Sequence, residues 1–351
     1  MMRISGYILI GILVYGCTNK PVETIQKRPN IVFIMSDDHA YQAISAFGHG
    51  LNQTPGIDRL AKEGILFENS FVTNSICAPS RAVLLTGKHS HLNGVLDNLL
   101  AFDGSQQTFP KLLQKAGYET AMVGKWHLKS TPTGFDYFNI LRGQGEYYNP
   151  FFIGEEDTVQ IEGYVTDITT DIAIDWLKSR NDDDSPFCLL LHHKAPHRNW
   201  MPNLKHLSLF DGEDLPVPEN YFDDYKTRSA AAVEQAMEIA RDMRDQWDLK
   251  VLPEDPNVDD WTDKLYAWHY GKLMTDEQRE VWDSYYNPKN ESYISGTMTE
   301  EETAIWKYQR YIKDYLRCIA SVDENVGRVL DVLDEMNLSE NTLVVYTSDQ
   351  G

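Results

Sequence analysis

Basic residues and long apolar runs are both scarce in this chain of 351 residues. Lysine and arginine number 32 against 53 aspartate and glutamate residues, which gives a formal net charge of -21. A surface with this balance repels nucleic acid and anionic membranes, so we expect neither as a partner. An anionic substrate would have to be bound by a local cluster of basic residues. The composition, 42% hydrophobic and 24% charged, is typical of one large globular domain or two small ones.

An apolar run near the N-terminus, residues 7–15, is too short to span a bilayer. It follows a single arginine and precedes Gly16 and Cys17, as in an export signal. Residues 14–17, Val-Tyr-Gly-Cys, resemble a bacterial lipoprotein cleavage box, in which the cysteine is lipidated. The alternative is an ordinary signal peptide cut nearby. We therefore expect a signal at 1–17, a polar tether at 18–29, and an exported protein in the periplasm, on the outer membrane or at the cell surface, attached only through a lipid on Cys17.

Cysteine is also rare, with four residues at positions 17, 77, 188 and 318. If Cys17 is lipidated, three remain, and an odd number argues against a complete disulfide framework. Cys188 and Cys318 lie in apolar or helical runs, where each is most simply a small buried hydrophobic residue. Cys77 fits neither description, since a proline and an arginine follow it closely.

The middle and end of the chain alternate between short apolar runs and amphipathic segments. We expect strands at 31–35, after Gly64, at 119–123 and 187–191, and within 341–351, with helices near 57–63, from just after Cys77 to near Gly87, and near 111–116, 167–179 and 306–336. This alternation predicts an α/β fold with a largely parallel central sheet and helices on both faces. Residues 203–303 are acidic and rich in Trp and Tyr; we interpret them as a peripheral insertion, more simply a solvated helical hairpin than the wall of a substrate cleft.

Polar clusters recur where the apolar runs end. They are Asp37-Asp38, Lys125 with His127, His192-His193-Lys194, and Asp349-Gln350. In an open parallel sheet these ends lie side by side at the edge where ligands bind. Three carboxylates and one amide oxygen form an oxygen-only set that suits Ca²⁺ or Mg²⁺ rather than zinc. The alternative is that the aspartates only cap the helices that follow.

Cys77 precedes the start of a predicted helix, because Pro79 suits a first helical turn. The free N–H groups and the dipole of such a helix end favour an anion such as sulfate or phosphate. Arg81 adds a planar bidentate donor for the oxygens of that anion.

The run Cys77-Ala78-Pro79-Ser80-Arg81, followed by "AVLLTGK", resembles the signature of the type I sulfatases of the alkaline phosphatase superfamily. "NIVFIMSDDHA" resembles the first strand and metal site of that family, "GKWHL" its lysine and histidine element, and "NTLVVYTSDQG" its second metal strand, all in the family's order. The resemblance implies that a maturation enzyme oxidises Cys77 to Cα-formylglycine. It also implies an alkaline phosphatase-like fold.

Carried over residue by residue, the resemblance implies the following roles. Ca²⁺, with Mg²⁺ as the alternative, would be bound by Asp37, Asp38, Asp349, Gln350 and the hydrated formylglycine at Cys77. Arg81 and Lys125 would hold the hydrate and the sulfate, and His127 would be the base for sulfate elimination. His197 is the first choice and His193 the second for the general acid, Lys194 would contact sulfate, and His192 would pack under the sheet edge. With Lys129 and Arg198 these basic residues would form a cationic pocket.

The segments around Cys77 and His197 look most like those of bacterial polysaccharide sulfatases, including N-acetylglucosamine-6-sulfatase-like enzymes. The expected function is therefore hydrolysis of sulfate esters on a polysaccharide or oligosaccharide, as a sulfuric ester hydrolase. One alternative is a phosphodiesterase or phosphonate monoester hydrolase of the same superfamily. The other alternative is a non-catalytic, truncated lipoprotein that binds sulfated glycan. Family members normally continue beyond Gly351, so we expect residues 30–351 to be a catalytic domain that lacks its C-terminal part.

Overall fold

The sheet of this protein is mixed but mostly parallel. The computed structural model describes residues 27–180, 185–252 and 261–350. Seven strands form one sheet in the order β5-β4-β3-β2-β6-β1-β7, in which β3, β2, β6, β1 and β7 are parallel and β4 and β5 add an antiparallel hairpin at one edge. The predicted fold class is thereby confirmed. The strands are β1 Asn30–Ser36, β2 Glu119–Gly124, β3 Tyr137–Leu141, β4 Phe151–Ile153, β5 Thr158–Gln160, β6 Phe187–His192 and β7 Thr342–Ser348.

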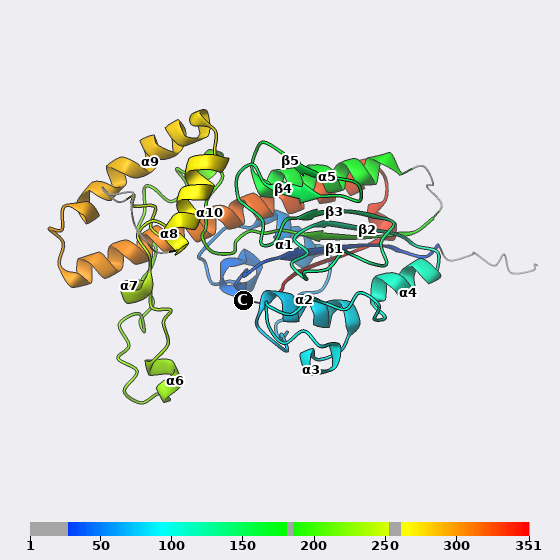
Figure 1. Cartoon of the computed structure of the whole chain (residues 1–351), viewed down its shortest axis with the longest axis horizontal. Helices are drawn as coiled ribbons and strands as arrows, with labels where there is room; N and C mark the ends of the chain where they lie inside the picture. Colours follow the sequence, from blue (N-terminus) through cyan, green and yellow to red (C-terminus); the bar gives the residue numbers. More distant parts are fainter. Residues whose placement is uncertain (1–26, 181–184, 253–260, 351) are drawn as a thin grey trace, which may run out of the picture.

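Helices cover both faces of the sheet (Figure 1). Apolar residues of α1, α5 and α10 pack on one face, whereas those of α2 and α4 pack on the other. The middle strand β6 is buried along its whole length, as the uninterrupted apolar run of residues 187–191 predicts. The helices are α1 Pro55–Glu63, α2 Cys77–Thr86, α3 Ser90–Asn93, α4 Phe109–Lys115, α5 Val165–Ser179, α6 Ala230–Val233, α7 Ile239–Asp242, α8 Trp261–Trp268, α9 Asp276–Ile294 and α10 Glu300–Glu335.

The described parts of the predicted insertion, residues 203–252 and 261–303, hold α6 to α9 and lie beside the N-terminal half of α10, beyond the end of the sheet (Figure 1). The expectation of a solvated hairpin is wrong for part of this segment, because α9 buries Trp282 and Tyr286 in the main hydrophobic core. Residues 246–251 are also buried or half-buried, and Asp248 forms an ion pair with Arg198 of the site described below. The acidic residues of the insertion are mostly exposed, but Asp248 is fully buried.

The strand expected after Gly64 is also wrong. Residues 65–76 form no strand, and their apolar side chains are exposed: Ile65 by 78%, Phe67 by 71% and Phe71 by 88%. An apolar run becomes a strand only where a neighbouring strand accepts its backbone hydrogen bonds, and the described residues offer none here.

Cys77, Cys188 and Cys318 are free and buried, and the burial of Cys188 and Cys318 confirms what their apolar surroundings predict. Cys17 and the predicted signal lie outside the described residues. None of the helices in the described part of the chain is long and apolar enough to cross a membrane.

Candidate active site

Neighbouring strands end side by side at one edge of the sheet, and the residues that follow them converge there. β2, β6, β1 and β7 are adjacent in the sheet. The backbone N–H of Asp37, after β1, donates to the carbonyl of Ala195, after β6, at 3.3 Å. The N–H of Asp349, after β7, donates to the carbonyl of Ser36 at 3.1 Å. The parallel pairing itself therefore brings together residues that are more than 300 positions apart.

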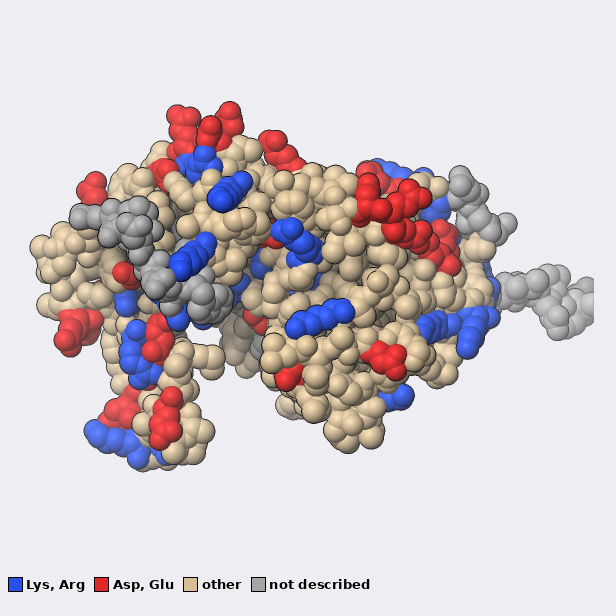
Figure 2. All heavy atoms as spheres, viewed as in Figure 1, with Lys and Arg blue, Asp and Glu red and all other residues tan. Residues whose placement is uncertain are grey.

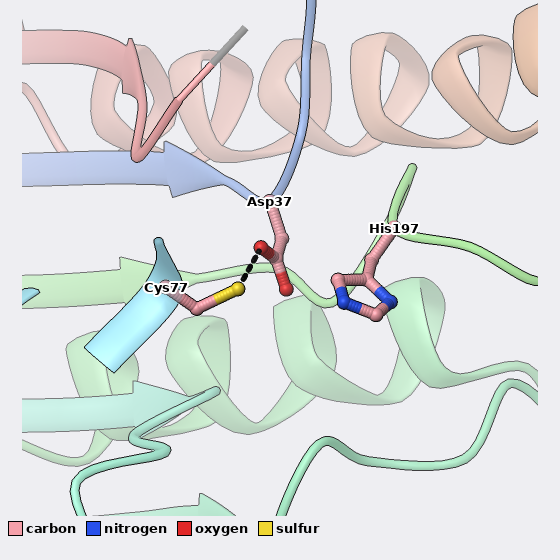
Figure 3. A group of neighbouring side chains, drawn as sticks. All are labelled: Asp37, Cys77 and His197. Atoms are coloured by element: carbon pink, nitrogen blue, oxygen red, sulfur yellow. Dashed lines mark hydrogen bonds between the residues drawn. The ribbon is translucent and has the colours of Figure 1, made fainter. Parts of the chain in front are cut away.

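Cys77 is the first residue of α2, and its side chain points into this cluster (Figure 3). Its Sγ lies 3.4 Å from Oδ1 of Asp37, 3.3 Å from Nε2 of Gln350 and 3.8 Å from Nζ of Lys125. His197 lies on the opposite side of Asp37 from Cys77 (Figure 3). Burial, with a smaller contribution from Asp349, raises the pKa of the Cys77 thiol to about 11. The thiol is consequently protonated at neutral pH and is a poor nucleophile as it stands.

The carboxylates of Asp37, Asp38 and Asp349 form an oxygen-rich cluster. One oxygen of each lies within 4.8 Å of the other two. Burial raises the pKa of Asp38, an effect opposed by the hydrogen bond from Nε2 of Gln350 to its Oδ1 at 2.6 Å. Oε1 of Gln350 is buried and has no hydrogen-bond partner among the described residues. Such a set of oxygens, one of them unsatisfied, fits a hard divalent cation.

Two buried cations offset these charges. Arg81 donates from Nη2 and Nε to Oδ2 of Asp349 at 2.8 and 3.1 Å, and from Nη1 to the carbonyl of Lys125 at 2.6 Å. Nζ of Lys125 forms a salt bridge with Oδ2 of Asp37, and both side chains are fully buried. Burial lowers the pKa of Lys125, and Asp349 partly opposes this. The site thus combines an anionic half and a cationic half in a water-poor interior.

Two of the predicted histidines lie at the cluster. Nδ1 of His197 donates to the carbonyl of Arg198 at 2.5 Å, because a carbonyl can only accept, and Nε2 lies 3.9 Å from Oδ2 of Asp38. This tautomer leaves Nε2 able to take up a proton. Burial and nearby cations hold the pKa of His197 well below its usual value and lower that of His127 to about 3. Both rings are therefore neutral in this structure.

The structure does not bring His193 to the cluster. The ring is fully buried, neither nitrogen has a hydrogen-bond partner among the described residues, and the charge that opposes its lowered pKa is Asp167 of α5. His192 is buried as well, but Nδ1 lies 3.4 Å from Nη1 of Arg81. Lys129 binds the carbonyl of Leu99 at 3.1 Å on the surface.

Lys194 and Arg198 lie beside the cluster. Nζ of Lys194 is buried 4.6 Å from the ring centre of Tyr147, and burial lowers the pKa of Lys194 to about 8. Arg198 forms an ion pair with Asp248 of the insertion. The hydroxyl of Tyr147 donates to the carbonyl of His197 at 2.6 Å. The sequence does not predict this contact, because no motif surrounds Tyr147. Ser80 was also not predicted as a site residue, although it lies inside the motif that begins at Cys77; its hydroxyl donates to the carbonyl of Asp349 at 2.6 Å.

Comparison with known families gives this geometry its context. The sulfatase family model matches residues 29–351, nearly all of the described chain. The chain belongs to the sulfatase family. The predicted membership is thereby confirmed.

Individual relatives are similar over most of this chain. An N-acetylglucosamine-6-O-sulfatase from Bacteroides thetaiotaomicron is 49% identical over 339 residues, which cover 96% of this chain and 60% of the relative. The solved structure of BT4656 with its substrate D-glucosamine-2-N,6-O-disulfate has a TM-score of 0.88 and 50% identity, over 93% of this chain and 66% of that one. A phosphonate monoester hydrolase of Agrobacterium radiobacter has a TM-score of 0.58 at 19% identity, over 92% of this chain and 62% of that one, and shows the fold alone.

Proposed function

We propose that this sulfatase hydrolyses a sulfate ester of a glycan, with 6-sulfated N-acetylglucosamine as the first substrate class to test. The observation that carries the proposal is the position of Cys77, at a helix start between three carboxylates and two buried cations. The 49% identity to an N-acetylglucosamine-6-O-sulfatase supports the sugar class. The chain spans 60% of the length of that relative.

Position 77 fits an oxygen nucleophile better than a thiol. Asp37 offers an acceptor and Lys125 and Gln350 offer donors around the Sγ position, which suits hydroxyl groups. Conversion of Cys77 to Cα-formylglycine by a maturation enzyme would supply a hydrated aldehyde as a nucleophile that is regenerated in each turnover. Asp37 would orient that group, and Lys125 would stabilise it as it loses a proton.

Asp37, Asp38, Asp349 and Gln350 would hold Ca²⁺, or Mg²⁺ in its place. The bound cation would supply electrostatic stabilisation of the sulfuryl oxygens. Within the chain itself, Arg81 forms a buried ion pair with Asp349, and the hydroxyl of Ser80 donates to the backbone carbonyl of Asp349. This prearranged set of charges lowers the cost of bringing an anionic ester into the site.

The histidines would move the protons. Nε2 of His197 would be protonated when the anionic substrate enters, and would then give that proton to the departing sugar oxygen. Its Nδ1, held by the carbonyl of Arg198, keeps the ring in position. His127 is neutral and would take a proton as sulfate leaves. Lys194 would bind a sulfate oxygen.

Turnover tests the proposal directly. The natural protein, co-produced with a formylglycine-generating enzyme, should release inorganic sulfate from N-acetylglucosamine 6-sulfate, and mass spectrometry should find formylglycine at position 77. Cys77→Ala should abolish release, whereas Cys188→Ala, another buried cysteine, should not. A strong preference for aryl phosphate diesters would instead favour the phosphodiesterase function. Binding of sulfated sugar without turnover by the matured protein would favour a non-catalytic glycan-binding protein.

We also propose that the protein is an exported lipoprotein of the periplasm or outer membrane. The signal-like residues 1–17 support this, and a membrane-anchored hydrolase suits a polymeric substrate. In the native host Cys17→Ser should move the protein from the membrane to the soluble fraction. Retention of the variant in the membrane fraction would refute the lipid anchor.

A further inference from the structure

A cavity of about 480 Å³ adjoins the candidate active site. Lys194 and His197 belong to both, and His197 lies 3.9 Å from Asp38 of the carboxylate cluster. The volume lies within the range of small-molecule sites in proteins. The cavity is lined by the turn after β3, the loop after β6 and the insertion.

The charge of the cavity is opposite to that of the protein. Its lining holds four basic residues, namely Arg142, Lys194, Arg198 and Arg244, and one carboxylate, Glu146. The chain as a whole has 32 basic and 53 acidic residues, and Figure 2 shows acidic side chains gathered toward the periphery of the face drawn. Such a local reversal attracts an anion to the cavity.

Arg198 is held in place by the insertion. Its Nε and Nη2 donate to Oδ1 and Oδ2 of Asp248 at 2.6 and 2.5 Å. The carboxylate of Asp248 is fully buried and also accepts the backbone N–H of Arg244 at 2.8 Å. The Arg198 side chain nevertheless remains 44% exposed. Asp248 therefore acts as a positioning residue, which leaves Nη1 of Arg198 for a ligand.

Arg142 also lines the cavity, and contacts with two aromatic rings and one carboxylate hold its guanidinium. Its guanidinium lies 3.9 Å from the ring centre of Phe151 and 5.7 Å from that of Trp268. Nη2 donates to Glu146 at 2.9 Å. A fixed guanidinium loses little freedom when it binds a sulfate or carboxylate. Trp247 and Trp268 add apolar surface of the kind that contacts sugar rings.

We propose that this cavity binds a second anionic substituent, sulfate or carboxylate, of the saccharide whose scissile sulfate lies at position 77. The inference rests on the proposed function and deepens it. Arg142 and Arg198 select for glycans with at least two negative charges, and the insertion determines this selectivity because it supplies Asp248, Arg244 and the tryptophans.

Steady-state kinetics with the matured natural protein test the selectivity. The substrates are 6-sulfated N-acetylglucosamine, the same sugar with a second sulfate, and a 6-sulfated disaccharide whose second unit is a uronic acid. We expect kcat/KM to be about tenfold or more higher for a doubly charged substrate, and Arg142→Gln to reduce that preference about tenfold through KM. Arg198→Gln should act in the same direction, although it leaves Asp248 unpaired and therefore tests folding as well. The two doubly charged substrates distinguish a charge on the same sugar from one on its neighbour.

Arg328→Gln is the matched control, since Arg328 is 39% exposed and paired with Asp171 outside the cavity; it should leave the preference unchanged. Equal kcat/KM for singly and doubly charged substrates, or no effect of Arg142→Gln on their ratio, overturns the inference while the proposed function stands. If no substrate is turned over, the proposed function fails. Calorimetry with the Cys77→Ala protein and the disulfated sugar then still tests whether the cavity binds the second anionic group. Binding weakened about tenfold by Arg142→Gln supports the cavity site, and absent or unchanged binding overturns it.

Discussion

Replacing Arg81 with methionine removes the cation that holds the carboxylate of Asp349 inside the protein. Both side chains are almost completely buried, and three donor contacts of Arg81 lie between 2.6 and 3.1 Å from their acceptors. Methionine has a similar length but offers no donor. The variant therefore leaves Asp349 as a buried charge with its principal partner gone.

Breaking a buried ion pair on one side costs about 3–5 kcal/mol, because the remaining charge keeps its desolvation penalty. We expect the free energy of unfolding of Arg81→Met to fall by about this amount in calcium-free buffer. Arg81→Lys retains the charge but lacks the planar guanidinium that donates to both Asp349 and the carbonyl of Lys125. The decrease in its free energy of unfolding should therefore be smaller, about 1–3 kcal/mol. Added Ca²⁺ should recover part of the loss if Asp349 binds it.

Urea unfolding followed by circular dichroism measures these differences. Arg59→Met is the matched control, because Arg59 also contacts two carboxylates, Asp331 and Asp334, at 2.6 and 2.9 Å but on the surface. Exposed ion pairs contribute little, so this control should unfold close to the wild type. An Arg81→Met protein as stable as the Arg59→Met control would refute the reasoning.

Three further predictions concern α1, Asp323 and the metal ligands. Gly56→Ala should destabilise the fold by about 1–3 kcal/mol, since an added Cβ would lie 2.3 Å from the backbone carbonyl of Asp323. Gly212→Ala is the control and should not destabilise the fold, because open space surrounds Gly212. Equal thermal stability of the two variants would contradict this prediction. Burial raises the pKa of Asp323 to about 6. The stability that this group contributes below about pH 4 should therefore be lost as the pH rises through 6. Asp323→Asn should flatten the decrease in the free energy of unfolding between about pH 4 and pH 6, measured by urea unfolding. Asp38→Asn should weaken Ca²⁺ binding about tenfold or more by calorimetry because the cation loses a charged ligand, whereas exposed Asp103→Asn should bind as the wild type does.

Much of the central sheet could be predicted from apolar runs alone. The runs at 31–35, 119–123 and 187–191 became β1, β2 and β6 because each is long enough for a strand buried on both faces. The exposed run at 65–76 shows the limit of that rule. Ile65, Leu66 and Phe67 are as apolar as those runs, yet a strand also needs a neighbouring strand to accept its backbone hydrogen bonds, and the run itself does not supply one.

The sequence by itself determined which residue types meet at the site, since polar residues at the ends of parallel strands must share one edge of the sheet. That rule predicts from the sequence alone that Asp37, Lys125 and Asp349 lie together. Only the tertiary structure decided which histidine joins them, because His193 turns toward α5 while His197, four positions later, returns to Asp38. The cavity likewise depends on tertiary contacts, because the guanidinium of Arg198 is oriented by Asp248, 50 residues further along the chain.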